Sequence, residues 1–220
     1  MSRNLSPWRA LVVLLAVLAA GLVWSPPVSA DTTWSGTLTQ AIAHIPVAGE
    51  SRTGYERTKF HLWIDADGDG CDTRDEVLIS EAEDAPTVGS GCSLTGGRWY
   101  SYYDGVSQTS ASALDIDHVV PLAEAWDSGA GAWTAQRRED YANDLSDSHT
   151  LVGTTASLNR SKGDQDVAEW TPPINDCRYI KDWVTAKIRW SLSQDAAEKS
   201  ALQQLAGGCT NSTITVTVTG

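Results

Sequence analysis

The feature that most constrains the fold is a short strand ending at a proline, followed later in the chain by a second strand and a short helix. Residues 114–122 (LDIDHVVPL) alternate apolar and polar side chains and then reach Pro121, which predicts a strand that runs into a turn. Residues 150–152 predict a second strand, and residues 157–164 (SLNRSKGD) predict one or two helical turns. Such a hairpin and helix would bring a histidine, a carboxylate and an amide onto converging surfaces.

The order of these residues resembles the HNH endonucleases, also called the ββα-metal or His-Me finger group. The resemblance rests on Asp117-His118 at the end of the first strand and on the run Asn159-x-x-Lys162-Gly163-Asp164 about forty residues later. Further segments, at residues 126–130, 141–145 and 162–164, look like the secreted bacterial branch of the family. The resemblance implies an α+β fold: a single domain with a ββα-metal (HNH) core, additional helices and a β-hairpin.

The residue types suit phosphodiester hydrolysis, which needs an activated water and a stabilised leaving oxygen. A neutral imidazole accepts a proton near neutral pH, so His118 is the expected general base. A hard divalent cation prefers oxygen ligands, which the Asp117 carboxylate and the Asn159 amide offer. The resemblance implies the same catalytic set, with Mg²⁺ or Mn²⁺ as the metal. Arg160 and Lys162 are then expected to contact substrate phosphates.

Several of these residues also have a purely structural interpretation. Lys162 can be a cation at the C-terminal end of a helix, followed by Gly163 as the helix cap. Asp115 is expected to be a solvated strand residue, and Glu124 an acid on the surface of a helix.

The chain departs from the family pattern at one position. The family has an Asn before a Leu, nine residues ahead of the final Asn, and this chain has Thr150 there. A threonine can still hydrogen-bond a backbone group, and Asn143 is an alternative source of the amide. The residue that orients His118 therefore stays open among these, and His149 is either an auxiliary acid or ligand or a structural residue.

The N-terminus predicts export. Arg3 and Arg9 precede an apolar run at residues 10–23, and residues 25–30 (SPPVSA) supply a breaker and a small-x-small site, which predicts a signal peptide at residues 1–30. The alternative, a membrane anchor, would need a longer apolar run. We therefore expect a secreted, extracellular protein with no membrane attachment after cleavage.

Cysteine usage agrees with export. The chain has four cysteines, an even number that favours two disulfides in an exported protein and allows three pairings. We favour the local pairs, Cys71 with Cys92 and Cys177 with Cys209. A zinc knuckle, the competing idea, would need a Cys-x-x-Cys motif that the sequence does not contain.

Charge argues against a nuclease at first sight. The net charge is −12, and removing a leader with two arginines and no acid makes it −14, whereas phosphate binding normally leaves a basic footprint. Residues 31–130 hold 5 basic and 17 acidic side chains, and residues 131–220 hold 9 and 11. The second half therefore predicts a local positive surface, formed by Arg137, Arg138, Arg160, Lys162, Arg178, Lys181, Lys187 and Arg189.

Residues 65–76 (DADGDGCDTRDE) match the twelve-residue calcium loop at every position. The expected ligands are Asp65, Asp67, Asp69, the Cys71 carbonyl, Thr73 and Glu76. A strand is expected to enter the loop where a helix is usual. The alternatives are a structural Ca²⁺ and an Asp/Gly turn held by a disulfide at Cys71, with Arg74 paired to a neighbouring acid.

The remaining patterns predict a helix within residues 31–48, a strand at 59–64, a hairpin around Gly96-Gly97, and helices at 121–127, 134–143, 179–192 and up to 205. The chain is divided into a part at 31–113 with the calcium-loop-like segment and the hairpin, the nuclease core and C-terminal helices at 114–206, and a tail at 207–220.

Taken together, the sequence predicts a secreted, monomeric, metal-dependent HNH endonuclease that hydrolyses DNA, with RNA as a second substrate, at low sequence specificity. A calcium-dependent extracellular binding module and a metal-dependent phosphoesterase on a non-nucleic substrate are the alternatives. The sequence specifies no inhibitor partner.

Overall fold

The computed structural model describes residues 32–220, so the predicted signal peptide lies outside the described residues. The fold is α+β and forms a single domain. Its helices are α1 (Leu38–His44), α2 (Thr73–Glu81), α3 (Leu122–Asp127), α4 (Ala135–Ala142), α5 (Ala156–Lys162), α6 (Asp176–Arg189) and α7 (Ala196–Ala206), with 3-10 turns at Arg57–Lys59, Ser90–Cys92, Ala111–Ala113 and Ala130–Ala132. Its strands are β1 (Thr32–Thr37), β2 (Thr87–Val88), β3 (Leu94–Thr95), β4 (Trp99–Ser101), β5 (Val106–Gln108), β6 (Leu114–His118), β7 (Leu151–Thr155) and β8 (Thr213–Val218).

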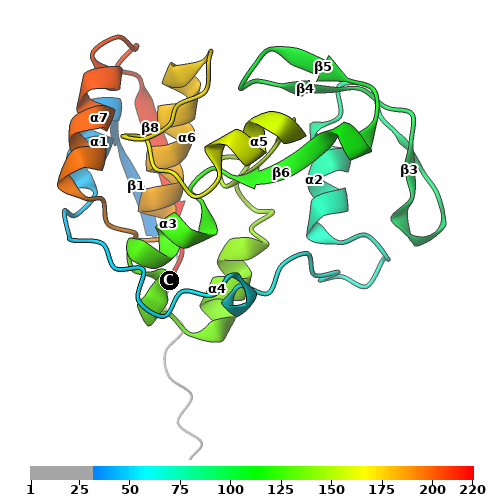
Figure 1. Cartoon of the computed structure of the whole chain (residues 1–220), viewed down its shortest axis with the longest axis horizontal. Helices are drawn as coiled ribbons and strands as arrows, with labels where there is room; N and C mark the ends of the chain where they lie inside the picture. The colour runs from blue at the N-terminus through cyan, green and yellow to red at the C-terminus, as the bar shows by residue number, and fades with distance from the viewer. Residues whose placement is uncertain (1–31) are drawn as a thin grey trace, which may run out of the picture.

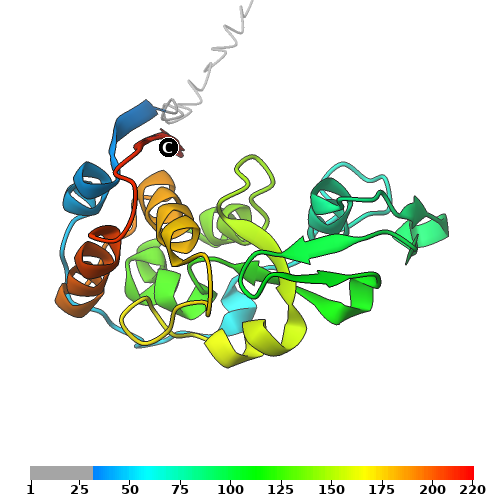
Figure 2. The ribbon, with the colours of Figure 1, turned by 90° about the horizontal axis from the view of Figure 1, so that it is seen from above.

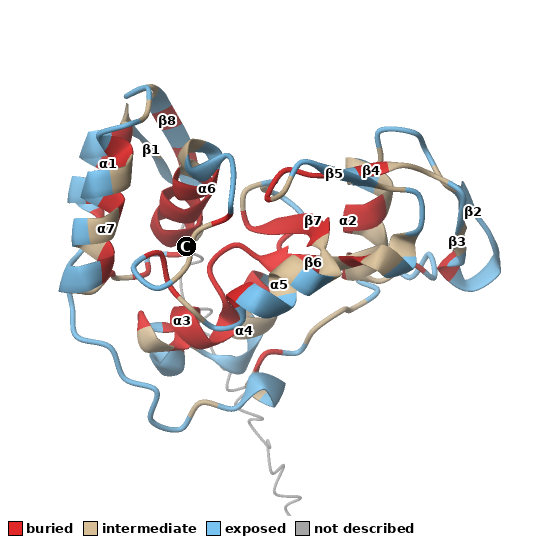
Figure 3. Cartoon of the chain, turned by 45° about the horizontal axis from the view of Figure 1, so that its top comes forward, coloured by how far each residue is buried: buried red, intermediate tan, exposed pale blue. Residues whose placement is uncertain are grey.

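The strands of the described chain form four small antiparallel sheets, β1-β8, β2-β3, β4-β5 and β6-β7. Helices α1, α6 and α7 gather around β1 and β8 at one end, and α2 lies with the short hairpins at the other (Figure 1). The view from above shows the same division (Figure 2). The larger core cluster includes Trp183, Tyr141 and Phe60, and a smaller one joins α2 to β6 around Leu78, Trp99 and other residues. Helix α6 and strand β7 are largely buried (Figure 3).

Strands β6 and β7 pair with His118 opposite Leu151 and Asp117 opposite Val152. Because side chains alternate along a strand, Asp117 and His118 point to opposite faces of this hairpin. Helix α5 begins directly after β7, whose last residue, Thr155, is the N-cap of the helix, and α5 contacts β6. The paired strands and this helix form the unit that the sequence predicted, with α3 and α4 between the two strands.

Both disulfides are the local pairs, Cys71–Cys92 and Cys177–Cys209, and no cysteine of the described chain is free. The first joins the start of α2 to the turn before β3, and the second joins α6 to the segment after α7. No helix within residues 32–220 is long and apolar enough to cross a membrane.

The helix predicted within residues 31–48 is confirmed as α1, but residues 32–37 form β1, because this Thr-rich start pairs with β8 in the C-terminal tail. Two other predicted elements were wrong. The strand expected at 59–64 is a 3-10 turn and an irregular segment, held by side-chain bonds to its backbone. Gly96-Gly97 separates β3 from β4, which pair with β2 and β5 and not with each other. The predicted Thr134 helix cap is confirmed.

Candidate active site

His118 stands at the end of β6 with its ring orientation fixed. Its Nε2 lies 3.0 Å from the Ala142 carbonyl oxygen, which can only accept, so Nε2 carries the proton and Nδ1 is the basic nitrogen. Trp63 and Tyr141 contact the ring on its flanks, with centroids 5.8 and 5.9 Å away. Burial and, to a smaller extent, the positive charge of Arg57 lower the pKa of His118 to about 3, so the imidazole is neutral at physiological pH. No residue described between 32 and 220 hydrogen-bonds Nδ1.

The carbonyl that holds His118 belongs to a braced segment. The Thr150 hydroxyl donates to Asp144 at 3.0 Å, and the Arg189 guanidinium and the Trp190 indole donate to the same carboxylate at 2.6 and 3.0 Å. The Thr150 carbonyl also accepts from the Val119 amide, directly after the histidine. Thr150 therefore braces the segment between α4 and β7, although it does not touch the imidazole.

Asp117 points into the protein on the other face of β6. Lys162 donates to both of its carboxylate oxygens at 2.8 and 2.7 Å and to the His118 carbonyl at 2.8 Å. The Tyr103 hydroxyl donates to Asp117 at 2.6 Å. Burial raises the pKa of Asp117 and lowers the pKa of Lys162, while their attraction opposes both shifts. Three acceptors use all three protons of the ammonium group, which favours the charged pair.

Asn159, on α5, is half-buried beside Asp115, which shares a face of β6 with Asp117. Its amide nitrogen is 3.5 Å from Asp115, and Arg160 forms an ion pair with the same carboxylate at 3.3 Å. Arg160 is largely exposed, whereas Lys162 on the same helix is fully buried. Of the two predicted phosphate contacts, the structure therefore leaves Arg160 in solvent and engages Lys162 with Asp117.

These side chains border one cavity of about 180 Å³. It is lined by Arg57, Ile116, Asp117, His118, Pro121, Leu122, Asn159, Arg160, Gly163 and Asp164. The structure thus brings together the three residues predicted to be catalytic, His118, Asp117 and Asn159, although Asp117 is engaged by Lys162.

Asn143 and His149 lie outside this cavity. Asn143 accepts from the Ile64 amide and the Thr73 hydroxyl and donates to the His61 and Glu139 carbonyls, so it ties the irregular segment before α2 to the end of α4. His149 bonds Asp147 at 2.6 Å, which raises its pKa.

Comparison with known proteins places all the cavity-lining residues except Arg57 inside a recognised domain. Residues 72–205 match the family described as GmrSD restriction endonucleases, C-terminal domain. The chain belongs to this family. It is an HNH-type family, which confirms the resemblance found in the sequence. The chain is also 40% identical over 202 residues to an uncharacterized secreted protein of Arthroderma benhamiae, which covers 89% of this chain and 98% of that protein. No solved structure matches the chain.

Within the GmrSD-type domain, the oxygen donors suit a hard divalent cation. The Asn159 amide oxygen has no hydrogen-bond donor among the described residues, and the Asp115 carboxylate lies beside it. Asp117 keeps acceptor capacity at the oxygen that binds Lys162 alone. Mg²⁺ commonly takes one or two carboxylates and completes its shell with water and substrate phosphate, so this donor set fits such an ion.

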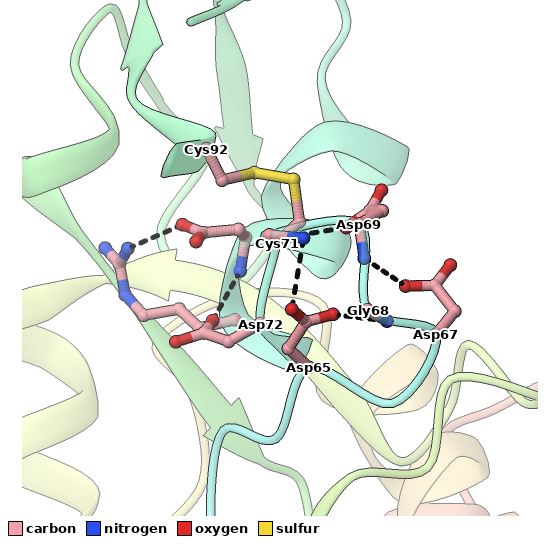
Figure 4. The surroundings of a disulfide bond; sticks show 10 residues. Asp65, Asp67, Gly68, Asp69, Cys71, Asp72 and Cys92 are labelled. Carbon is pink, nitrogen blue, oxygen red and sulfur yellow. Dashed lines mark hydrogen bonds and ion pairs between the residues drawn. A yellow bond between two sulfur atoms is a disulfide. The ribbon is translucent and has the colours of Figure 1, made fainter. Parts of the chain in front are cut away.

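The loop at residues 65–76 lies outside the cavity, beside the Cys71–Cys92 disulfide (Figure 4). Asp65 accepts from the amides of Gly68 and Gly70, and Asp69 accepts from the Cys71 amide at 2.7 Å. Carboxylate oxygens of Asp65, Asp67 and Asp69 lie within 4.8 Å of one another, and Asp69 and Glu76 belong to a second such group. Arg74 lies 3.8 Å from Asp75, so part of the structural alternative is also present.

Sequence reasoning missed three parts of the site. The Ala142 carbonyl orients His118, but a backbone acceptor leaves no trace in residue identity. Tyr103 donates to Asp117, but nothing in the local sequence distinguishes it from the neighbouring aromatic residues Tyr100 and Tyr102. Arg57 reaches the cavity from before the matched domain, and nothing local distinguishes it from other surface arginines.

Proposed function

We propose that the chain is a secreted, metal-dependent HNH endonuclease that hydrolyses phosphodiester bonds in DNA, and in RNA as a second substrate, with low sequence specificity. The observation that carries this proposal is His118, whose protonated Nε2 is held by a carbonyl. Its basic Nδ1 has no hydrogen-bond partner among residues 32–220, and the residue lines a cavity with oxygen donors. The GmrSD-type domain and the secreted relative support it.

In this mechanism the His118 Nδ1 takes a proton from a water molecule, whose oxygen then attacks the phosphorus. The bond to the 3′ oxygen breaks, and that oxygen takes a proton from solvent. The carbonyl of Ala142 stabilises the imidazolium that forms. Mg²⁺ or Mn²⁺, held by Asp117 and Asn159 with Asp115 nearby, would supply positive charge for the phosphate and the leaving oxygen.

The test uses purified residues 31–220 with supercoiled plasmid and with RNA, each with Mg²⁺, Mn²⁺ or EDTA. We expect cleavage that EDTA abolishes and that His118→Ala reduces by at least about 100-fold with folding intact. His44→Ala, at the end of the remote helix α1, is the matched control and should cleave at the wild-type rate. A His118→Ala protein that cuts normally would remove the assignment of the base.

The same assay separates the two alternatives. A phosphoesterase with a non-nucleic substrate would release nitrophenol from small phosphate esters but leave plasmid and RNA intact. A calcium-dependent binding module would cleave neither.

We also propose a structural Ca²⁺ in the loop at residues 65–76. The convergence of Asp65, Asp67 and Asp69 supports it, and helix α2 begins at Thr73, inside the loop. The loop is tied to the catalytic half through Asn143, so the ion would stabilise the segment that carries Trp63.

A further inference from the structure

Arg57 is a cation that the segment preceding the GmrSD-type domain brings into the cavity. The matched domain starts at residue 72, so Arg57 lies outside it. It nevertheless lines the same cavity as His118 and Asn159, and its charge is close enough to affect His118. The cavity is thus completed by a part of the chain that the domain itself does not include.

The backbone that carries Arg57 is firmly held. Phe60, three residues on, is 1% exposed in the main core, and its amide bonds the Arg57 carbonyl at 3.1 Å. The Arg138 guanidinium, from α4, donates to the Lys59 carbonyl at 3.2 Å, and the Lys59 ammonium donates to the Gly54 carbonyl at 2.6 Å.

Arg57 also differs from nearby arginines in its ion pairing. Arg52 pairs with Asp127 at 2.6 Å, and Arg160 pairs with Asp115 at 3.3 Å. Within residues 32–220, no carboxylate lies within 4.0 Å of the Arg57 guanidinium, although the chain is strongly acidic. A guanidinium that extends from a held backbone, borders the cavity and has no carboxylate partner among the described residues is suited to bind an anion.

We propose that Arg57 binds a non-bridging oxygen of the scissile phosphate and stabilises the negative charge that develops there during attack. The inference rests on the proposed nuclease function and names a catalytic residue outside the family's domain. Planar guanidinium donors match phosphate oxygens, and a preorganised donor acts most strongly where charge develops in the transition state.

The experiment compares Arg57→Ala, Arg57→Lys and the control Arg98→Ala, whose side chain pairs with Glu83 and Asp84 away from the cavity. Each is assayed on plasmid and on bis(p-nitrophenyl) phosphate, a diester with no neighbouring phosphates. We expect Arg57→Ala to lower kcat about 100-fold on both substrates, with KM changed less than about threefold. Arg57→Lys should recover part of the loss, and Arg98→Ala should match wild type.

The outcomes separate this inference from the proposed function. If wild type cleaves neither nucleic acid nor the small diester, the nuclease proposal fails and takes the role of Arg57 with it. If wild type cleaves and His118→Ala does not, but Arg57→Ala cleaves normally, only the role of Arg57 is overturned. A loss confined to plasmid also overturns it, because Arg57 would then contact a remote phosphate. Thermal melting of each variant confirms folding, and Arg57→Lys serves if Arg57→Ala unfolds.

Discussion

Lys162 offers the sharpest test of how the site is built, because its two interpretations predict opposite results. If Lys162 contacts a substrate phosphate, its substitution should reduce activity and change stability little. The structure instead buries the ammonium completely against Asp117 and the His118 carbonyl. We therefore expect Lys162→Met to act first on the free energy of unfolding.

The magnitude follows from what the substitution leaves behind. Methionine fills much of the volume of lysine, but it leaves Asp117 buried with only the Tyr103 hydroxyl as a donor. Removing one partner of a buried ion pair costs about 3–5 kcal/mol. For a domain of this size, 1 kcal/mol corresponds to roughly 2–4 °C in Tm, so we expect Tm to fall by about 10 °C.

Urea denaturation followed by tryptophan fluorescence measures this loss. The control is the double variant Asp117→Asn/Lys162→Met, which removes both charges and should regain at least about 2 kcal/mol of the loss. A Lys162→Met protein within about 1 kcal/mol of wild type would refute the buried pair. Lost cleavage in that stable protein would favour the phosphate contact predicted from the sequence.

Further measurements probe the rest of the fold and the loop. Burial raises the pKa of Glu81 from 4.5 to about 7, so the folded state holds a proton that the unfolded state releases, and stability should fall as pH rises from about 4.5 through 7. Glu81→Gln should reduce the loss of unfolding free energy between pH 5 and pH 8 by about 2 kcal/mol, measured by urea denaturation at the two pH values. A variant that loses as much stability as wild type over this range would contradict the prediction. Replacing Cys177 and Cys209 by serine opens a loop with a sequence separation of 32, and should cost about 3 kcal/mol in the same assay. Adding Ca²⁺ to EDTA-treated protein should raise Tm by several degrees and Asp69→Asn should weaken that gain, whereas a Tm indifferent to Ca²⁺ would remove the calcium proposal.

The parts of the fold that the sequence predicted well are those set by local patterns. The alternation before Pro121 predicted β6, and the Thr134 cap predicted the start of α4. Helix α6 was predicted from its apolar positions, and the structure starts and ends it three residues earlier than expected. The spacing of Asp117-His118 and Asn159 predicted which residues would meet at one cavity.

The parts that failed depend on partners far away in the chain. β1 is a strand because β8, some 180 residues later, supplies its hydrogen bonds. The segment after Phe60 is irregular because Asn143 satisfies its backbone groups from another element. Neither partner is visible within a local window, so the sequence did not separate β1 from the helix that follows it and predicted a strand at 59–64.

The structure differs from the sequence prediction in where the basic side chains lie. Of the basic residues in the predicted positive surface, Lys162 and Lys187 are fully buried against carboxylates, and Arg189 is buried against Asp144. Arg160 and Arg178 pair with acids of their own. The three buried residues therefore stabilise the fold, and nearby carboxylates offset the charge of the exposed Arg160 and Arg178. We therefore expect the substrate to be bound mainly near the scissile bond, with weak and sequence-tolerant affinity. Arg57, which lines the cavity and has no carboxylate partner among residues 32–220, would then supply a large share of the positive charge that the protein offers to the reacting phosphate.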